Sequence, residues 1–404
     1  AFSVQGFKAS VAGFTGISGD LGFAVSGSEL VAVGRNFTAG YLDPTYGGIR
    51  VTNASFGLVA NASGTAFELG GGSLQLAVAG LTNVTSGSTF AQFSTSGITL
   101  AAGRQVTAGG LGYSFATGIS PASNVFAVTG FHATVQDFVS LAGNVGFSVT
   151  SGGIVAVADE VTATLSAGSY ASLSTSGRLG LRVVNDQVAL ELTGTSLSAN
   201  VANLANASAD HVFVQYTSPT ARVAQNDTLR VGPASYTFTR AISPGTVAFD
   251  VRGLSVTLFG VVTASGDIGF AYRPTERLIA GYATDFSAAF HVGDQIEASV
   301  SHATFDIRLG SQLLFALQGE ARLRMFGLID ETVAVRVQPD YTRLTLDDNS
   351  QINAAVLACS AALPDLFFGR NGTGLTLEDA SVGFAVATDL DSNRFWVAAK
   401  AQAS

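Results

Sequence analysis

The stretch Ser18-Gly19-Asp20-Leu21-Gly22-Phe23-Ala24-Val25 decides the fold, because the chain repeats it. Two further versions begin at Ala142 and Ser265, and a degraded fourth copy begins at Asp379; all of them keep the Gly-Phe pair of Gly22-Phe23. Self-similarity at a fixed period is typical of proteins built from structural repeats. The period therefore has to be established before any other property of the chain is interpreted.

Other segments keep the same spacing through the length of the unit. Phe67-Glu68-Leu69 matches Leu190-Glu191-Leu192, and Phe90-Ala91-Gln92-Phe93 matches Phe213-Val214-Gln215-Tyr216. We therefore predict tandem repeats with a period of about 123 residues. The predicted units are residues 1–124, 125–247, a diverged third unit 248–371 and a partial fourth unit 372–404. The start without Met and the end inside a unit lead us to expect a piece of a longer chain.

The fold class follows from the alternation of large and small residues. Runs such as Leu74-Gln75-Leu76-Ala77-Val78 have period two, which predicts half-buried strands. Many runs carry a mid-length glycine, which marks a bulge or a bend. We predict an all-β chain of antiparallel meanders, whose long Gly-kinked strands form a two-layered elongated rod. A string of β-sandwich domains is the alternative. Two helices are also expected, over 198–205 and over the Ala-rich stretch 351–363 before Pro364.

Composition excludes several classes of function. The net charge is −9 and the chain has only two lysines, Lys8 and Lys400, which argues against nucleic acid and against a polybasic membrane patch. No apolar run is long enough for a transmembrane helix. Cys359 is the single cysteine, so an internal disulfide and a multi-thiolate metal site are excluded.

The candidates for metal chemistry are weak. Asp389, Asp391 and Asn393 have the D-x-D-x-N spacing that begins a calcium loop. The loop lacks the glycine and the final acid that such a site uses, so a hairpin turn is the favoured interpretation and calcium the alternative. Asp20, Asn144 and Asp267 are interpreted as turn residues. The four histidines have no partner at metal-ligand spacing. We expect no cofactor.

Seven N-x-S/T sequons are candidate glycosylation sites, which would require an extracytoplasmic location. They lie at Asn36, Asn53, Asn61, Asn83, Asn206, Asn226 and Asn371. Asn83 and Asn206 occupy matching positions in the first two units, which shared ancestry also explains.

The Gly-Asp-x-Gly-Phe core at residues 19–23, followed by Leu30-Val31-Ala32-Val33, resembles very long tandem-repeat bacterial surface proteins. The resemblance implies a fibre, coat or adhesin outside the cell. No nucleophile elbow, zinc-protease motif or phosphate-binding loop is present, and no carboxylate pair stands out, so we expect no enzyme.

Three functions remain open. The first is a structural segment of an extracellular filament, surface layer or fibre at the cell surface, which assembles with copies of itself or with neighbouring repeats. The second is a lipid-carrying conduit, if the apolar inner face stays open as a groove. The third is a glycan-binding adhesin, which usually needs exposed aromatic platforms; Trp396 is the only tryptophan.

Overall fold

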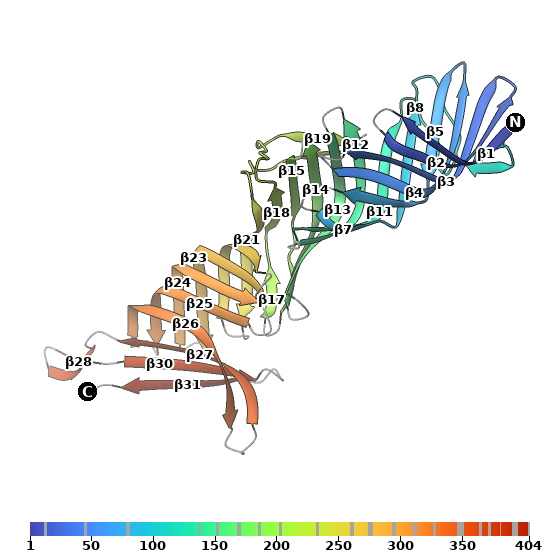
Figure 1. Cartoon of the computed structure of the whole chain (residues 1–404). Helices are drawn as coiled ribbons and strands as arrows, with labels where there is room; N and C mark the ends of the chain where they lie inside the picture. The colour runs from blue at the N-terminus through green and yellow to red at the C-terminus, as the bar shows by residue number, and fades with distance from the viewer. Residues whose placement is uncertain are drawn as a thin grey trace. The chain divides into compact units, whose positions relative to one another are not determined.

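The structure is a computed structural model of residues 1–404, drawn in Figure 1. It describes residues 1–11, 14–43, 47–77, 81–136, 139–150, 153–167, 171–184, 187–201, 204–231, 234–258, 262–273, 278–292, 296–309, 313–325, 329–345, 351–362, 366–370, 373–379, 381–389 and 395–402. Every regular element assigned in these ranges is a β-strand, and none is a helix. The all-β prediction is therefore confirmed.

The strands of the first half vary from four to fifteen residues. They are β1 Phe2–Val11, β2 Phe14–Ser26, β3 Glu29–Asp43, β4 Gly47–Asn61, β5 Gly64–Gly70, β6 Ser73–Ala77, β7 Leu81–Thr85, β8 Ser88–Ser94, β9 Gln105–Ala108, β10 Leu111–Ser114, β11 Asn124–Val135, β12 Val139–Thr150, β13 Gly153–Ala167, β14 Ala171–Val184, β15 Gln187–Gly194, β16 Ser198–Val201, β17 Leu204–Ser208, β18 His211–Thr217, β19 Thr228–Val231 and β20 Ala234–Thr237.

The strands of the second half include the longest in the chain. They are β21 Val247–Leu258, β22 Val262–Arg273, β23 Leu278–Val292, β24 Ile296–Leu309, β25 Leu313–Met325, β26 Ile329–Thr345, β27 Gln351–Ala362, β28 Leu366–Arg370, β29 Thr373–Leu377, β30 Ser381–Asp389 and β31 Phe395–Gln402. Most strands belong to a large antiparallel sheet, while the hairpins β9–β10, β19–β20 and β28–β29 form two-stranded sheets.

The chain divides into two compact units. Unit 1 contains residues 1–164, 175–194 and 213–248, and unit 2 contains 165–174, 195–212 and 249–404. In unit 1, β1 to β5 follow one another as antiparallel neighbours. The next part of its sheet is built as β5 pairs with β8, and β8 with β11.

Two stretches of unit 1 cover apolar faces of its strands. Residues 95–123, which contain the β9–β10 hairpin, contribute Phe115 and Ile119 to a core that includes Val33 of β3 and Val59 of β4. Residues 218–246, which contain β19–β20, contribute side chains such as Phe238 to a second core with Val157 and Ala189. These two stretches are called the first cover and the second cover below. Both cores are filled by side chains that water does not reach.

Unit 2 is a meander of long strands, from β21 to β26, that follow one another in antiparallel order (Figure 1). Its core contains stacked aromatic rings. The rings of Phe286 and Phe305 are 4.4 Å apart and nearly parallel, and Phe315 packs beside Phe305. Cross-strand aromatic pairs of this kind stabilise an antiparallel sheet. In the described residues, no helix is long and apolar enough to span a membrane.

A glycine bulge occurs at three strand pairs. Gly6, Gly130 and Gly253 have φ angles of 61°, 59° and 60°, which only glycine adopts freely, and each lies at a shift in strand register. The amide of each donates to a side-chain oxygen on the neighbouring strand. The acceptors are Asp20 at 3.1 Å, Asn144 at 3.1 Å and Asp267 at 2.9 Å. The prediction that these acceptors lie in turns is therefore wrong, since they lie inside β2, β12 and β22.

Both predicted helices are also wrong. Residues 198–205 lie in β16 and β17 where the structure describes them, and residues 351–362 form β27. Helix propensities of ordinary residues differ by only about a few tenths of a kcal/mol per residue, so tertiary contacts readily override them. β27 pairs with β26 on one edge and β30 on the other, so its backbone groups are satisfied by two ladders.

Candidate functional site

Two buried carboxylates are the most unusual polar groups in the described chain. Glu68 on β5 and Glu191 on β15 have 0% exposed surface. A charged side chain is rarely buried in this way unless other groups pair with it. The spacing between them is 123 residues (191 − 68), the period found in the sequence.

The Glu68 carboxylate accepts hydrogen bonds from strands and from the first cover. Gln92 on β8 donates to Oε2 at 2.7 Å, and Tyr113 on β10 donates to Oε1 at 3.1 Å. The backbone amide of Ala116 donates to Oε1 at 2.6 Å. Thr117 contacts Oε2 at 3.4 Å and also accepts a bond from Gln92 at 2.6 Å. We call these five residues the first cluster.

The Glu191 carboxylate has corresponding partners. Gln215 on β18 donates to Oε2 at 2.6 Å, and Tyr236 on β20 donates to Oε1 at 2.9 Å. Thr239 donates twice to Oε1, through its amide at 2.7 Å and its hydroxyl at 3.0 Å. Thr193 on β15 lies 2.7 Å from the Tyr236 hydroxyl. We call these residues the second cluster.

Each tyrosine ring lies against a glycine of the strand beneath it. A Cβ atom on Gly57 of β4 would lie 2.5 Å from the Tyr113 ring, and one on Gly180 of β14 would lie 2.3 Å from the Tyr236 ring. Neither glycine has a positive φ angle, so glycine is required there by space and not by backbone conformation. The absence of a side chain lets the ring descend until its hydroxyl reaches the carboxylate.

The tyrosines are strongly perturbed acids. Burial, together with the charge of Glu68 and the hydrogen bond to it, raises the pKa of Tyr113 well above its usual range. Burial raises the pKa of Tyr236 even further; Glu191 adds to the shift, while Thr193 and Arg178 oppose it. Both groups therefore remain protonated donors at any ordinary pH.

The hydrogen bonds of each cluster serve to hold the cover on the sheet. Each carboxylate is enclosed, and its acceptor sites face donors of the protein itself. In each cluster a strand carries the acceptor and the cover carries several donors, so the cluster ties the cover to the sheet. A network that is satisfied in this way makes the core rigid, while an unpaired member would be costly.

Near each cluster, an ion pair joins cover and strand with opposite polarity. Arg104 of the first cover pairs with Glu29 of β3. Asp227, at the matching position of the second cover, pairs with Arg182 of β14 at 2.6 Å. All four side chains are partly exposed, from 25% to 35%.

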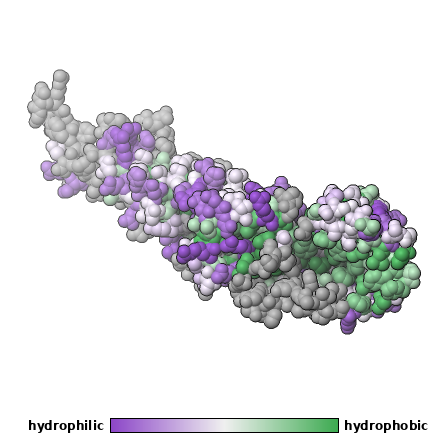
Figure 2. Space-filling view, turned by 90° about the horizontal axis from the view of Figure 1, so that it is seen from above, coloured by the Kyte–Doolittle hydropathy of each residue, from purple (hydrophilic) through white to green (hydrophobic). Residues whose placement is uncertain are grey.

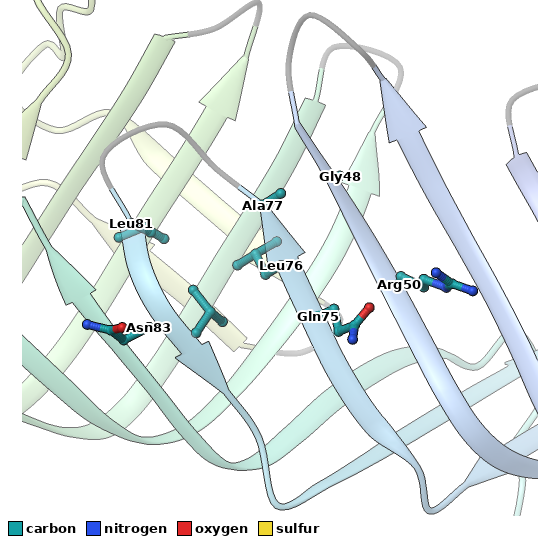
Figure 3. Close-up of a pocket in the computed structure, with 8 residues that line it drawn as sticks. Gly48, Arg50, Gln75, Leu76, Ala77, Leu81 and Asn83 are labelled. Carbon is teal, nitrogen blue, oxygen red and sulfur yellow. The ribbon is translucent and has the colours of Figure 1, made fainter.

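An open depression of about 240 Å³ lies on β4, β6 and β7 (Figure 3). Its lining includes Arg50, Gln75, Leu76 and Leu81, and Figure 3 shows Arg50 and Gln75 on adjacent strands. The described lining contains neither a carboxylate nor a histidine or cysteine, so it offers no acid–base pair and no nucleophile of those types.

The side chains of the three calcium candidates lie outside the described part of the structure. Asp389 ends β30, its side chain is not described, and Asp391 and Asn393 lie outside the described residues. Among the described residues, no three His, Cys, Asp or Glu side chains gather closely enough to hold a metal ion. His132 contacts Ser140 at 3.0 Å, and His302 contacts Asp285 at 2.6 Å.

Backbone conformation accounts for several of the sequon asparagines. Four of them have φ angles in the left-handed region, which asparagine tolerates better than most residues. They are Asn36, Asn53, Asn83 and Asn226, with φ angles of 50°, 59°, 53° and 67°. Asn61 donates from Nδ2 to Glu29 at 3.2 Å. Asn206 lies on β17 at a register shift, and Asn371 is outside the described residues.

Sequence reasoning matched Glu68 with Glu191 and Gln92 with Gln215, but it did not identify them as a site. The available signal was a glutamate kept at the same place inside two otherwise apolar strands. The hydrogen-bond partners of the two glutamates are 24 to 49 residues away along the chain, so only the fold brings them together.

No protein-family model, curated protein or solved structure matches this chain.

Proposed function

We propose that this chain is a structural, non-enzymatic segment of an extracellular filament, surface layer or fibre. The observation that carries the proposal is the use of its buried polar groups. Glu68 and Glu191 have no exposed surface, and their acceptor sites are occupied by residues of the covers. Groups with perturbed pKa values usually suggest catalysis, but here they are enclosed with partners that hold the fold together.

In the proposed role, antiparallel ladders provide stiffness and the covers keep the apolar faces from opening. The tandem repeats and the two-layered rod remain part of this proposal, as does assembly with copies of the chain or with neighbouring repeats. The lipid-carrying conduit receives less support, because the faces beneath the two covers are filled by Phe115, Ile119 and Phe238.

Electron microscopy of the purified chain over a range of concentrations tests the proposal. We expect ordered filaments or sheets with an axial spacing that is a multiple of one repeat. Native mass spectrometry of the same sample provides the control for bound lipid. Isolated particles at all concentrations would contradict the structural role, and particles that retain acyl chains would favour the conduit.

A further inference from the structure

The first strand, β1, exposes two apolar residues, and the counterparts of one of them, Val4, are fully buried elsewhere. Phe2 is 62% exposed and Val4 is 40% exposed. At the spacing of the repeat, Val4 corresponds to Val128 on β11 and to Val251 on β21, and both of these have 0% exposure. Figure 2 shows hydrophobic side chains gathered on the part of the chain that contains the N-terminal strands.

The difference between β1 and β11 is a missing neighbour. β11 pairs with β12 on one edge, and on the other edge with β8 over residues 124–129 and with β7 over residues 132–135. Among the described residues, β2 is the strand that pairs with β1, in the same bulged register that joins β11 to β12. β21 likewise has more than one neighbour, since it pairs with β22, β17 and β18.

We propose that the free edge of β1 is a docking site for a segment of the β7–β8 type, two short strands that lie end to end and run antiparallel to β1, supplied by another repeat of this kind. The occupant is defined by the edge that β11 already fills. The part of it that pairs beside Phe2 and Val4 would have the pattern of Thr89-Phe90-Ala91-Gln92-Phe93, which is uncharged and alternates aromatic with small or polar residues. Addition of such a strand satisfies the backbone groups of an exposed edge and covers the apolar side chains beside it.

The register of the docked segment follows from β11. Phe126 pairs with Ala91 and Val128 with Thr89, so Phe2 and Val4 would face small residues of the incoming strand. Beyond the Gly6 bulge, Lys8 takes the position of His132, which pairs with Thr85. A lysine on an edge strand discourages indiscriminate pairing. The edge is thus apolar at Phe2 and Val4 and charged at Lys8. This favours an incoming segment that leaves room for the ammonium group of Lys8.

A synthetic peptide of residues 81–94 added to the whole chain tests this inference. We expect the peptide to slow amide hydrogen exchange in residues 2–5 by about tenfold or more at saturation, as ladder formation protects edge amides. A peptide with Ala91→Pro is the matched control, because proline disrupts a strand that must pair. Equal protection by both peptides, or no protection at millimolar peptide, would overturn the proposal.

Two chain variants locate the binding. Val4→Lys puts a charge where the counterparts of Val4 are fully buried, so we expect peptide affinity to fall by about tenfold or more. Val25→Lys is the control, since Val25 is 75% exposed and lies on β2 next to the β2–β3 turn. Equal affinity for the two variants would contradict the assignment.

A second copy of the chain is the competing occupant. Protection of β1 that grows with concentration of the chain alone, and is lost in Val4→Lys, would identify a second copy and overturn the proposed β7–β8 type. The inference rests on the proposed structural role but fails separately from it. Absence of peptide binding with filaments present would remove only the docking site, whereas peptide binding without filaments would remove only the assembly.

Discussion

The two buried clusters hold a carboxylate with the same number of hydrogen bonds, but the bonds differ in length. In both clusters, a glutamate on a strand accepts hydrogen bonds from a glutamine side chain, a tyrosine hydroxyl and a backbone amide. The Thr239 hydroxyl donates to Glu191 at 3.0 Å, whereas the threonine hydroxyl of the first cluster, on Thr117, donates to Glu68 over 3.4 Å. The tyrosine of the second cluster is also better buried, because Tyr236 is 2% exposed while Tyr113 is half-buried.

Thr193 shows how the difference arises. At the 123-residue spacing Thr193 corresponds to Gly70, and its hydroxyl lies 2.7 Å from that of Tyr236. A Cβ atom on Gly70 would lie 3.2 Å from the Tyr113 hydroxyl, so the first cluster has little room for the same addition. The comparison indicates that the glutamate and its glycine platform form the common frame, and that the surrounding hydroxyls adjust its strength.

Removal of the glutamates breaks both clusters and should have the largest effect. Glu191→Ala leaves the donors of Gln215, Tyr236 and Thr239 buried without an acceptor, so we expect a loss of about 3–5 kcal/mol in the free energy of unfolding. Glu68→Ala should cost less, because the Tyr113 and Thr117 hydroxyls donate to Glu68 over longer distances, 3.1 Å and 3.4 Å. Urea unfolding measures the loss, and hydrogen exchange in residues 218–246 locates it.

The control for the glutamates is Glu160→Ala, since Glu160 is an exposed carboxylate on β13. We expect its effect to stay within about 0.5 kcal/mol. If Glu191→Ala lowered the free energy of unfolding no more than Glu160→Ala, the second cluster would not be what holds its cover on the sheet.

The glycines beneath the tyrosines come next. Gly180→Ala places a methyl group 2.3 Å from the Tyr236 ring, and Gly57→Ala places one 2.5 Å from the Tyr113 ring. We expect each to cost about 1–3 kcal/mol, with the larger value at Gly180, because a packed ring cannot move away freely. Thermal unfolding of the variants measures this.

Gly112→Ala provides the comparison for these two, because the nearest atom to its added methyl group is 3.7 Å away. It should be close to neutral. The clash also predicts coupling, so Gly180→Ala should cost much less in a chain that already carries Tyr236→Ala. Additive effects would show that the ring is not what excludes the methyl group.

The strands were predictable from the sequence to a greater extent than the clusters. Alternation in segments such as Leu74-Gln75-Leu76 is a local signal, and the structure buries Leu74 and Leu76 while Gln75 is exposed. The mid-strand glycines also predicted bulges, which occur at Gly6, Gly130 and Gly253. Local propensity failed over 351–362, where pairing on both edges of β27 decides the conformation.

The candidate site needed information that the sequence does not hold in one place. Asp20 was interpreted as a turn residue, because Gly-Asp pairs favour turns, yet its acceptor role depends on the amide of Gly6 on another strand. Glu68 requires a tyrosine from a cover that is 45 residues away. Long-range contacts of this kind follow from topology, which residue patterns alone leave open.

The tyrosine hydroxyls give a smaller effect that depends on pH. Tyr236→Phe removes the donor to Glu191 and the partner of Thr193, so we expect a loss of about 1–2 kcal/mol near pH 7. Tyr113→Phe should cost less, because its bond to Glu68 is longer, at 3.1 Å, and because Gly70, at the position that corresponds to Thr193, has no hydroxyl.

The pH dependence has a definite sign. The pKa of Tyr236 is raised in the folded chain, so the folded state holds its proton where the unfolded state releases it. This contribution to stability is fully present below about pH 10, the pKa of an unfolded tyrosine, and decreases above it by up to about 1.4 kcal/mol per pH unit. Unfolding curves from pH 8 to 11 should show a shallower decline for Tyr236→Phe; an unchanged decline would contradict the assignment.

The ion pairs of opposite polarity should have the smallest effect and give the finest test of the comparison. Arg104→Glu places a second negative charge beside Glu29, and we expect a loss of about 0.5–1 kcal/mol that shrinks in high salt. The reversed pair Arg104→Glu with Glu29→Arg should recover most of it in a double-mutant cycle. The corresponding reversal of Arg182 and Asp227 should recover less, because Arg182 also donates to the backbone oxygen of Arg222 at 3.1 Å, which a glutamate cannot do. Equal recovery for the two ion pairs would mean that only charge, and not this added bond, holds the second cover at this point.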